Sequence, residues 1–398
     1  MPSGSCLVIN TGSSSVKFAV FNTDSNQPFC QGQVTHLFSD STELTITTQS
    51  DKTRQNLAQA NHADALEAIL TKLNELGILD DVMVIGHRVV HGGPNANQPE
   101  LISTSTLDLI KQCSEFAPLH NPANLAGIEA CQRFNPTLPQ IAVFDTAFHS
   151  TLNDLSSHYA IPLEWQQQFG IKRFGFHGIN HHYIAQTSQR LLPDPAARGV
   201  VSAHLGNGCS VCAINDGRSV DTSMGFTPLE GLVMGSRCGD LDPGLLEYLC
   251  EKLNTDITDL TQQLNRQSGL QGLSGISGDM RLLLEARDQG NERAALAVEL
   301  FCYRLAKYIA SYVVPLQGID MLVFTAGIGE HAPAIRSQTV AWLAPLNFEL
   351  DTTLNQHTQQ AIRAISTTGS KPVYVIPANE EWMIAQQCFQ LLNRSGEI

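Results

Sequence analysis

The sequence predicts an α/β fold built as two similar halves, and three observations lead to this prediction. Short apolar runs repeatedly end in Gly, Asn, Asp or His, amphipathic helical patterns separate these runs, and one strand–turn–strand pattern recurs almost half a chain later. At 398 residues the chain is also too long for one ordinary core. We therefore expect two domains of similar architecture.

The predicted strands are the apolar runs, taken in chain order. They read CLVINTG, VMVIGHRVVHGG, IAVFDTAFH, GVVSAHLGNG, MLVFTAGIGE and VYVIPANEE. Helical spacing of apolar residues marks ADALEAILTKLNELG and NERAALAVELFCYRLAKYIASYVV as helices between them. Ligands of α/β proteins lie at the ends of strands, so the polar residues that close these runs are the first site candidates.

The internal repeat pairs two strand–turn–strand segments. TGSSSVKFAVF begins at Thr11 and LGNGCSVCAIN at Leu205, and both place a Gly-containing turn before a Ser-Val strand start. We place a first domain at 1–148 and a second at 149–381. A closing amphipathic helix at 382–398, introduced by Asn379 as N-cap, is expected to return to the first domain.

Composition excludes several classes of protein. The chain carries 24 basic and 38 acidic residues, a net charge of −14, which disfavours nucleic acid and anionic membranes as partners. No apolar run has membrane-spanning length, and MPSGSCLVIN lacks a secretion signal. We expect a soluble cytoplasmic protein whose ten cysteines are reduced; Cys209 and Cys212 match C-x-x-C but face opposite sides of a strand.

The first turn has the composition of a phosphate-binding hairpin. Gly12 permits unusual backbone angles, the serines at 13–15 offer hydroxyls and open N–H groups, and Lys17 lies on the face opposite an apolar row. GSSSVK lacks the second Gly and the Gly-Lys-Ser/Thr ending of a P-loop, so another nucleotide fold is required. A Ser-rich hairpin with a surface Lys is the alternative.

Two later turns have the same character. Gly206 and Gly208 flank Asn207 after one strand, and Gly327 and Gly329 lie between another strand and a helix N-terminus, where backbone N–H groups and the helix dipole favour anions. Each turn alone is weak evidence. Together the three predict a nucleotide.

Charged residues near the strand ends predict phosphoryl transfer. They are Arg88, Asp145, His177, Arg237 and Glu381. Arginine offers a fixed fork for carboxylate or phosphoryl oxygens, and carboxylates suit Mg²⁺. The alternatives are structural ion pairs for the arginines and a helix cap for Asp145.

Histidines outside these strand ends are ambiguous. FHGINHH has the composition of a zinc site but lacks the H-E-x-x-H pattern, and we place His181 and His182 on a helix capped by Asn180. His120 precedes a helix for which we predict Asn121 as N-cap and Pro122 as the first residue. His120 either donates to an oxyanion or is a simple loop residue.

These motifs carry a resemblance to a known family. VINTGSSSVKF, GHRVVHGG, APLHNPANL, FDTAFH, FGFHG, AHLGNG, DTSMGFTPLEGL, GDLDPG, FTAGIGE and NEE occur in the order found in acetate kinases, from residue 6 to about residue 392. The chain therefore resembles the acetokinase family, within the acetate and sugar kinase, heat-shock chaperone and actin superfamily. The resemblance implies two duplicated actin-like (ribonuclease H-like) domains, a nucleotide cleft between them, and a homodimer.

It further implies reversible, Mg²⁺-dependent in-line transfer between ATP and acetate, giving acetyl phosphate and ADP, with Mn²⁺ as a substitute metal. By position, Asn10 and Glu381 are expected at the metal, Lys17 at ATP and Asp145 as the catalytic carboxylate. His177 and Arg237 are expected to stabilise the transition state. The expected substrate-binding residues are Arg88, Val90, Leu119, His120, Phe176 and Pro228. The expected nucleotide-binding residues are His204, Leu205, Gly206, Asn207, Gly208, Asp279, Met280, Arg281, Gly327, Ile328, Gly329, Glu330 and His331.

Two alternatives to acetate phosphorylation stay open. Propionate and butyrate kinases share the pattern, although propionate kinases tend to carry a smaller residue at the position of Val90, which favours acetate. An actin-like or chaperone-like ATPase switch would not need Arg88 and Arg237 beside a small apolar pocket. The chain departs from the family pattern at Cys238, Cys209 and 179–180, none of which is an expected catalytic group.

Overall fold

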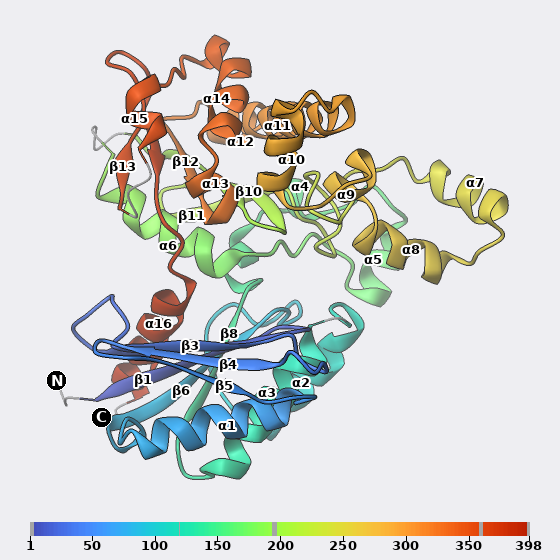
Figure 1. Cartoon of the computed structure of the whole chain (residues 1–398). Coiled ribbons are helices and arrows are strands. Elements are labelled where there is room, and N and C mark those ends of the chain that lie inside the picture. Colours follow the sequence, from blue (N-terminus) through green and yellow to red (C-terminus); the bar gives the residue numbers. More distant parts are fainter. Residues whose placement is uncertain (1–3, 119, 193–196, 358–360, 396–398) are drawn as a thin grey trace. The chain divides into compact units, whose positions relative to one another are not determined.

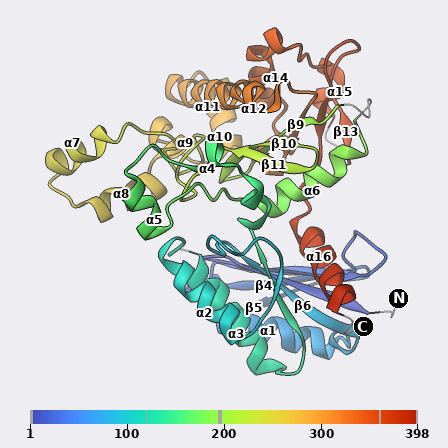
Figure 2. The same ribbon diagram turned by 180° about the vertical axis from the view of Figure 1, so that it is seen from behind.

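The fold divides into two compact units, each built on a mixed β-sheet with helices around it (Figures 1 and 2). The computed structural model describes residues 4–118, 120–192, 197–357 and 361–395. Unit 1 comprises Met1–Ser150 with Asn379–Ile398, and unit 2 comprises Thr151–Ala378. Glu381, which the expected boundaries put in the second domain, therefore lies in unit 1.

Among the described residues of unit 1, eight strands form one sheet in the order β5-β4-β3-β2-β1-β6-β8-β7. β1, β6 and β8 are parallel, and the remaining pairings are antiparallel. The strands are β1 (Ser5–Thr11), β2 (Val16–Asn22), β3 (Cys30–Thr35), β4 (Glu43–Thr48), β5 (Lys52–Asn56), β6 (Val82–Val89), β7 (Glu100–Leu101) and β8 (Gln140–Phe144). The helices are α1 (His62–Glu75), α2 (Thr104–Gln112), α3 (Asn121–Phe134) and α16 (Glu380–Ser395), with 3₁₀ turns at Leu79–Asp81, Cys113–Glu115 and Ala147–Thr151.

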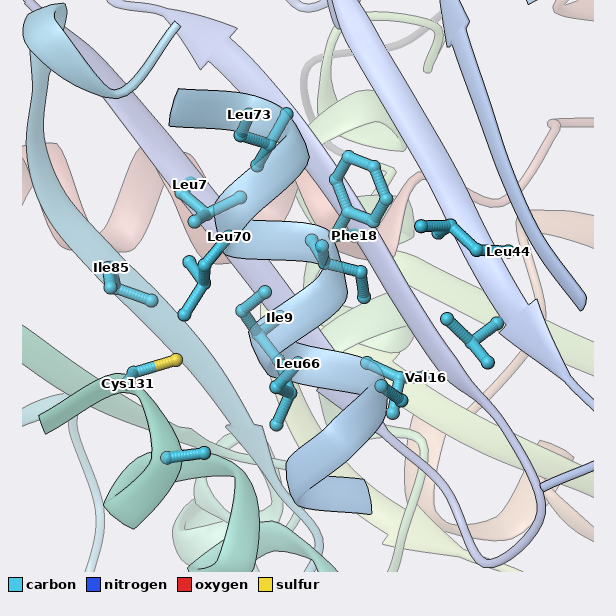
Figure 3. Packing of buried hydrophobic residues seen from close by; sticks show 14 of the residues in the cluster. Leu7, Ile9, Val16, Phe18, Leu44, Leu66, Leu70, Leu73, Ile85 and Cys131 are labelled. Carbon is cyan, nitrogen blue, oxygen red and sulfur yellow. The ribbon is translucent and has the colours of Figure 1, made fainter. Parts of the chain in front are cut away.

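Helices cover both faces of this sheet. α1 and α3 pack on one face and α16 on the other. Leu66, Leu70 and Leu73 recur along α1 at helical spacing and meet the alternate residues of β1 and β2, which Figure 3 shows in contact. Because both faces are covered, β1 is almost entirely apolar until Asn10, the first residue of the strand that is not fully buried.

Unit 2 has a six-stranded sheet among its described residues, in the order β11-β10-β9-β12-β14-β13. The strands are β9 (Gly199–Leu205), β10 (Cys209–Asn215), β11 (Arg218–Thr222), β12 (Met321–Thr325), β13 (Arg363–Ala364) and β14 (Val373–Val375). The longer helices are α6 (Gly178–Gln189), α7 (Gly244–Leu253), α8 (Ile257–Arg266), α10 (Met280–Asp288), α11 (Glu292–Ser311) and α14 (Pro333–Trp342). The shorter ones are α4 (Asp154–Ser157), α5 (Leu163–Phe169), α9 (Gly269–Ser274), α12 (Val313–Leu316), α13 (Ala326–His331), α15 (Thr352–Gln356) and the 3₁₀ turn Ala344–Leu346.

The two sheets repeat the same strand order. In unit 1 three antiparallel strands (β3-β2-β1) are followed by parallel β6 and β8 and antiparallel β7, and in unit 2 β11-β10-β9 are followed by β12, β14 and β13 with the same directions. The repeat expected from Thr11 and Leu205 corresponds to β1–turn–β2 and β9–turn–β10. The α/β class, the six predicted strands and the two predicted helices are confirmed.

Two helix starts differ from those predicted. α6 begins at Gly178, with His177 as N-cap, so Asn180 lies inside the helix and bonds His204 and Thr325 instead of capping. α3 begins at Asn121 and its N-cap is His120. The Asn121 side chain instead bonds the backbone N–H and carbonyl of His91, which follows β6. Those buried backbone groups need a partner, whereas solvent can replace a helix cap.

All ten cysteines lie in the described part of the chain and carry free thiols. Cys209 and Cys212 have separate partners on β10: the Cys209 thiol donates to the carbonyl of Gly206, and the Cys212 sulfur bonds Ser219. Over the described ranges, helices that combine the length and the apolar character needed to cross a membrane are lacking.

Candidate functional site

The part of the candidate site in unit 1 is centred on Arg88, near the end of β6. Nε and Nη2 of its guanidinium both donate to Oδ2 of Asp145, at 3.1 and 2.5 Å, and Nη1 donates to Oδ1 of Asn10 at 3.3 Å. These three residues end neighbouring parallel strands, β1, β6 and β8, whose carboxyl ends meet at one edge. Burial alone would lower the pKa of Arg88, but the carboxylates of Asp145, Glu380 and Glu381 raise it. The guanidinium therefore stays protonated.

A second carboxylate from α16 completes this cluster. Glu380 is the first residue of α16, and burial raises its pKa to about 7, an effect that Arg88 opposes and Asp145 and Glu381 reinforce. Its charge acts on Arg88 more strongly than that of Glu381, the residue expected from the sequence. Adjacent helix residues point in directions about 100° apart, which sequence position alone does not resolve.

These groups fit a hard cation. Oδ1 of Asp145 is buried and has no hydrogen-bond partner within the described ranges, a costly arrangement unless a ligand binds there. Asn10, Asp145, Glu380 and Glu381 can each offer an oxygen atom as a ligand, the kind that Mg²⁺ prefers. No cluster of three His, Cys, Asp or Glu residues suited to a metal occurs among the described residues, which is compatible with Mg²⁺ because that ion keeps several waters and substrate phosphates.

The first turn lies beside this cluster. Asn10 of β1 is paired with Lys17 of β2. The Lys17 side chain is exposed and lies on the face opposite Val16 and Phe18, as predicted, while those two residues enter the core. The hairpin is closed by a hydrogen bond from the Gly12 N–H to the carbonyl of Ser15, at 2.8 Å. The ammonium group of Lys17 and the Gly12–Ser15 turn therefore lie at the same end of β1 as Asn10.

The expected acyl-binding residues are divided between the units. Val90 is buried in unit 1, and its N–H donates to Oδ1 of Asn124 at 3.1 Å. His120 precedes α3 in the same unit, and Leu119 lies outside the described residues. Phe176 and Pro228 belong to unit 2, where Phe176 is buried.

His177 and Arg237 converge in unit 2 above the β9–β10 turn. A Cβ added to Gly208 would meet Nη1 of Arg237 and Nε2 of His177, each at 3.4 Å, so both groups approach the turn closely. Arg237 donates to the carbonyl of Pro228 at 3.2 Å, and burial lowers its pKa. His177 has φ 56°, a left-handed conformation that a non-glycine residue adopts at a cost of about 1 kcal/mol or more.

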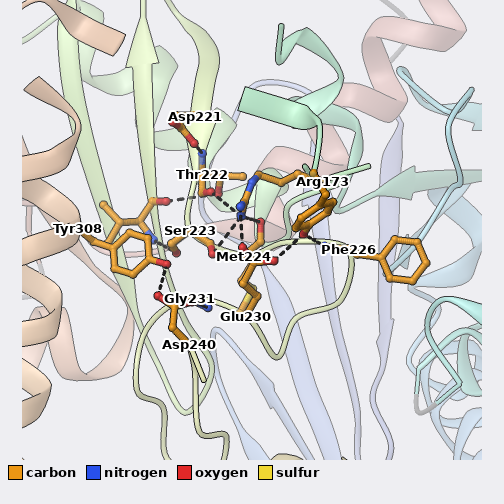
Figure 4. A network of polar contacts seen from close by, with 12 residues as sticks. Arg173, Asp221, Thr222, Ser223, Met224, Phe226, Glu230, Gly231, Asp240 and Tyr308 are labelled. Carbon is orange, nitrogen blue, oxygen red and sulfur yellow. Dashed lines mark hydrogen bonds and ion pairs between the residues drawn. The ribbon is translucent and has the colours of Figure 1, made fainter. Parts of the chain in front are cut away.

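A polar network fixes the chain that leads to Arg237 (Figure 4). Arg173 donates to the carbonyls of Thr222, Ser223 and Met224 at 3.2, 3.4 and 3.1 Å, and to Glu230 at 2.6 Å. Further along, Asp240 accepts from the N–H of Gly231 and from the Tyr308 hydroxyl, at 2.9 and 2.6 Å. The loop that carries Pro228 and Arg237 is thus held at both ends.

A cavity of about 770 Å³ in unit 2 collects the three expected nucleotide segments. That size suits a nucleotide. The expected residues that line it are Gly206, Asn207, Asp279, Met280, Arg281, Gly327, Ile328 and His331. The sequence did not indicate the remaining lining residues, Gly235, Ser236, Arg266, Gln271, Gly278, Leu284 and Ala332. Arg266 ends α8, and nothing in its local sequence distinguishes it from a surface arginine.

The other expected nucleotide residues of unit 2 are buried or half-buried. His204 stacks on His177 with ring centroids 4.1 Å apart, and Leu205 is fully buried. Gly208 lies beneath His177 and Arg237, as described above. Gly329 packs on Phe324, and the Glu330 carboxylate accepts from the N–H of Ala378 at 2.9 Å. These five residues of unit 2 are not among those that line the cavity.

Comparisons with known proteins agree on one family. Residues 5–386 match the Acetokinase family. The acetate kinase of Dichelobacter nodosus is 46% identical over 386 residues, covering 97% of this chain and 98% of that protein. The acetate kinase of Deinococcus deserti is 46% identical over 392 residues, with 97% of each chain covered.

Two solved structures are similar along nearly the whole chain. A propionate kinase from Francisella tularensis has a TM-score of 0.92 and 41% identity, covering 96% of this chain and 98% of its own. The acetate kinase of Porphyromonas gingivalis has a TM-score of 0.90 and 35% identity, covering 98% of this chain and 100% of its own. With the family match extending over nearly all of its length, this chain belongs to the acetokinase family.

Proposed function

We propose that this protein transfers the γ-phosphoryl group of ATP to acetate, reversibly, giving acetyl phosphate and ADP. It is a phosphotransferase with a carboxyl group as acceptor. The observation that carries the proposal is that three separately predicted nucleotide segments line one cavity. Its wall also includes Gly235 and Ser236, directly before Arg237. Family membership over nearly the full chain supports the same activity.

The chemistry has one main obstacle. Acetate is ionised at neutral pH, so it needs no strong base, but its carboxylate must approach an anionic phosphoryl group. We assign Arg88 to the acetate carboxylate, and Arg237 and His177 to the transferring phosphoryl oxygens. Positioning and charge compensation are then the main catalytic terms, as in other phosphoryl transfers.

The residues that would hold Mg²⁺ are Asn10 and Asp145, together with the carboxylates of Glu380 and Glu381 at the start of α16. When bound there, the ion would offset charge on the phosphate oxygens. One carboxylate oxygen of Asp145 already accepts two hydrogen bonds from Arg88. We therefore assign Asp145 to orienting that arginine and a cation, and not to abstracting a proton. Lys17 supplies a further positive charge beside Asn10.

The test is an acetate-dependent hydroxamate assay. We expect product only when ATP, Mg²⁺ and acetate are all present, and more than about a hundredfold loss of kcat in Arg237→Ala with normal folding. Arg198→Ala is the control. Arg198 is an exposed arginine of the same unit, and its Nη1 lies 3.7 Å from Oδ2 of Asp216, a weak pair because both side chains are exposed. Near-normal turnover of Arg237→Ala would contradict the assignment of Arg237 to the transferring phosphoryl group. ATP hydrolysis that does not depend on acetate would favour a nucleotide-driven switch.

Propionate is the second candidate acceptor. The similar structure from Francisella tularensis, 41% identical, is described as a propionate kinase, so family membership alone does not select the acyl group. Val90 favours acetate because its branched side chain, buried in unit 1, leaves less room than a smaller residue would. Comparing kcat/KM for acetate, propionate and butyrate, in the wild type and in Val90→Ala, distinguishes the two.

We also propose that the enzyme is a cytoplasmic homodimer. α7 has no buried residues and exposes Leu245, Tyr248 and Leu253, an apolar surface of the kind that oligomers cover. Light scattering on the purified protein tests the dimer. A molar mass of one chain across the working concentration range would contradict it.

A further inference from the structure

A buried polar layer lies between α6 and the sheet of unit 2, where packing normally puts apolar side chains. Ser202 and Ser210 face α6 from β9 and β10, and His181 faces them from the helix; all three are fully buried. Ser210 pairs with His204 across the strands, and His204 lies two residues from Ser202, which puts all three on one face. Burying so many polar groups is costly unless each is bonded.

The groups of this layer form one continuous chain of hydrogen bonds that includes His177. The Ser202 hydroxyl bonds Nδ1 of His181 at 2.9 Å, and Nε2 of His181 bonds the Ser210 hydroxyl at 2.8 Å. The same Ser210 hydroxyl bonds Nδ1 of His177 at 2.9 Å. Nε2 of His177 lies at the other side of the ring, toward Gly208 and Arg237. The chain therefore reaches the ring nitrogen that faces away from the site.

Proton counting couples the members of this chain. A serine hydroxyl donates one proton, so Ser210 donates to only one of the two histidines and must accept from the other. In one arrangement Ser202 donates to His181, His181 Nε2–H donates to Ser210, and Ser210 donates to Nδ1 of His177. The proton of neutral His177 is then on Nε2. The reverse order puts that proton on Nδ1 and turns a lone pair of Nε2 toward the site.

We propose that Ser210 and His181 are positioning residues that hold His177 as the Nε2–H tautomer, so that it donates to the transferring phosphoryl group. The inference rests on the proposed function, in which His177 meets an anion. Of the two arrangements of neutral His177, only the first offers that anion a hydrogen atom from Nε2. The ring of His177 lies between Ser210 and Gly208, and its backbone has the left-handed φ of 56°, a strained conformation of the kind found at functional sites. Stacking on His204, 4.1 Å between centroids, limits the remaining rotation of the ring.

Kinetics form the first arm of the test. Ser210→Ala should lower kcat about tenfold or more with the KM values for ATP and acetate unchanged, since residues that orient a catalytic group act on the reaction and not on binding. Ser210→Thr keeps the hydroxyl and should recover most of the loss. Ser188→Ala is the matched control: Ser188 is a fully buried serine on α6 whose hydroxyl has no partner among the described residues.

The second part of the test is an NMR measurement of the His177 tautomer in the full-length protein without substrate. Histidine-selective ¹⁵N labelling, with His177→Asn to assign the resonance, should show the His177 proton on Nε2 in the wild type and a mixture of tautomers in Ser210→Ala. A His177 proton on Nδ1 in the wild type overturns the proposal, even if Ser210→Ala does not fold. Wild-type kcat in a folded Ser210→Ala overturns it as well. Absence of any ATP–acetate activity would refute the proposed function, while the NMR result still decides the tautomer.

Discussion

Arg88 and Asp145 meet through a single carboxylate oxygen: Nε and Nη2 of the guanidinium both reach Oδ2, and Oδ1 stays buried without a hydrogen-bond partner among the described residues. A fork-to-fork pair would use both oxygens. The side-on contact leaves one charged acceptor for a ligand. It also gives Asp145 two functions, holding Arg88 and presenting an oxygen to a cation.

Asp145→Asn should lower kcat by about a hundredfold or more and raise the Mg²⁺ concentration needed for half-maximal rate. It removes the charge opposite Arg88, so we also expect a loss of about 3 kcal/mol in the free energy of unfolding, measured by urea denaturation. Glu43→Gln breaks the exposed Arg54–Glu43 pair, 3.9 Å apart, and should change neither quantity appreciably. A variant that keeps more than a tenth of wild-type kcat would exclude Asp145 from the cation site.

Gly269→Ala should inactivate the enzyme by displacing the Arg237 loop. Gly269 has φ +59°, and an added Cβ would lie 2.2 Å from the carbonyl of Met234 and 2.5 Å from that of Arg237. Gly275→Ala is the control, with φ +69° but open space around the added carbon. Both variants carry the strain of a left-handed alanine, about 1 kcal/mol. Only Gly269→Ala should lose kcat, about a hundredfold, and equal activities would show that Arg237 tolerates the shift.

Gly327→Leu should weaken nucleotide binding without harming the fold. Gly327 lies in α13, lines the cavity of unit 2, and an added Cβ meets no atom within 4 Å among the described residues. Replacing a helical glycine favours the helix by about 0.5–1 kcal/mol, so the melting temperature should not fall. We expect the KM for ATP to rise about tenfold and the KM for acetate to stay constant. An unchanged KM for ATP would place the nucleotide elsewhere.

His87 should make the protein sensitive to mild acid. It is 2% exposed, and burial lowers its pKa from 6.5 to about 4, an effect that its bond to Gln140 only partly offsets. Below pH 6.5 His87 binds a proton in the unfolded chain but stays neutral in the folded protein. The free energy of unfolding therefore falls as the pH drops from about 6.5 to about 4. Between pH 7.5 and 5 this amounts to about 2 kcal/mol.

The measurement is urea denaturation of the wild type and of His87→Gln at both pH values. The glutamine still donates to Gln140 but does not titrate, so the variant should lose about 2 kcal/mol less than the wild type on acidification. Parallel pH dependences of the two proteins would show that His87 is not the group responsible.

Much of the fold was predictable because its causes are local. Apolar runs that end in polar residues predicted six strands, and the alternation of Val16 and Phe18 with Lys17 predicted that Lys17 lies on the face opposite the apolar row. The two hairpins at Thr11 and Leu205 predicted the repeated topology of the two sheets. The starts of α3 and α6 were misplaced, since Asn121 and Asn180 have partners distant in sequence.

For the candidate site, the sequence by itself determined which residue types stand at the strand ends: Asn10, Arg88 and Asp145 follow directly from where β1, β6 and β8 stop. Only the tertiary structure decided which of them touch. It also decided how strongly each carboxylate at the start of α16 acts on Arg88: that of Glu380 raises the pKa of Arg88 more than that of Glu381, since the direction of a side chain depends on how α16 packs on its sheet. It also put Ser202, Ser210 and His181 behind His177, because hydrogen bonds between residues far apart in the chain exist only once the helix lies on the sheet.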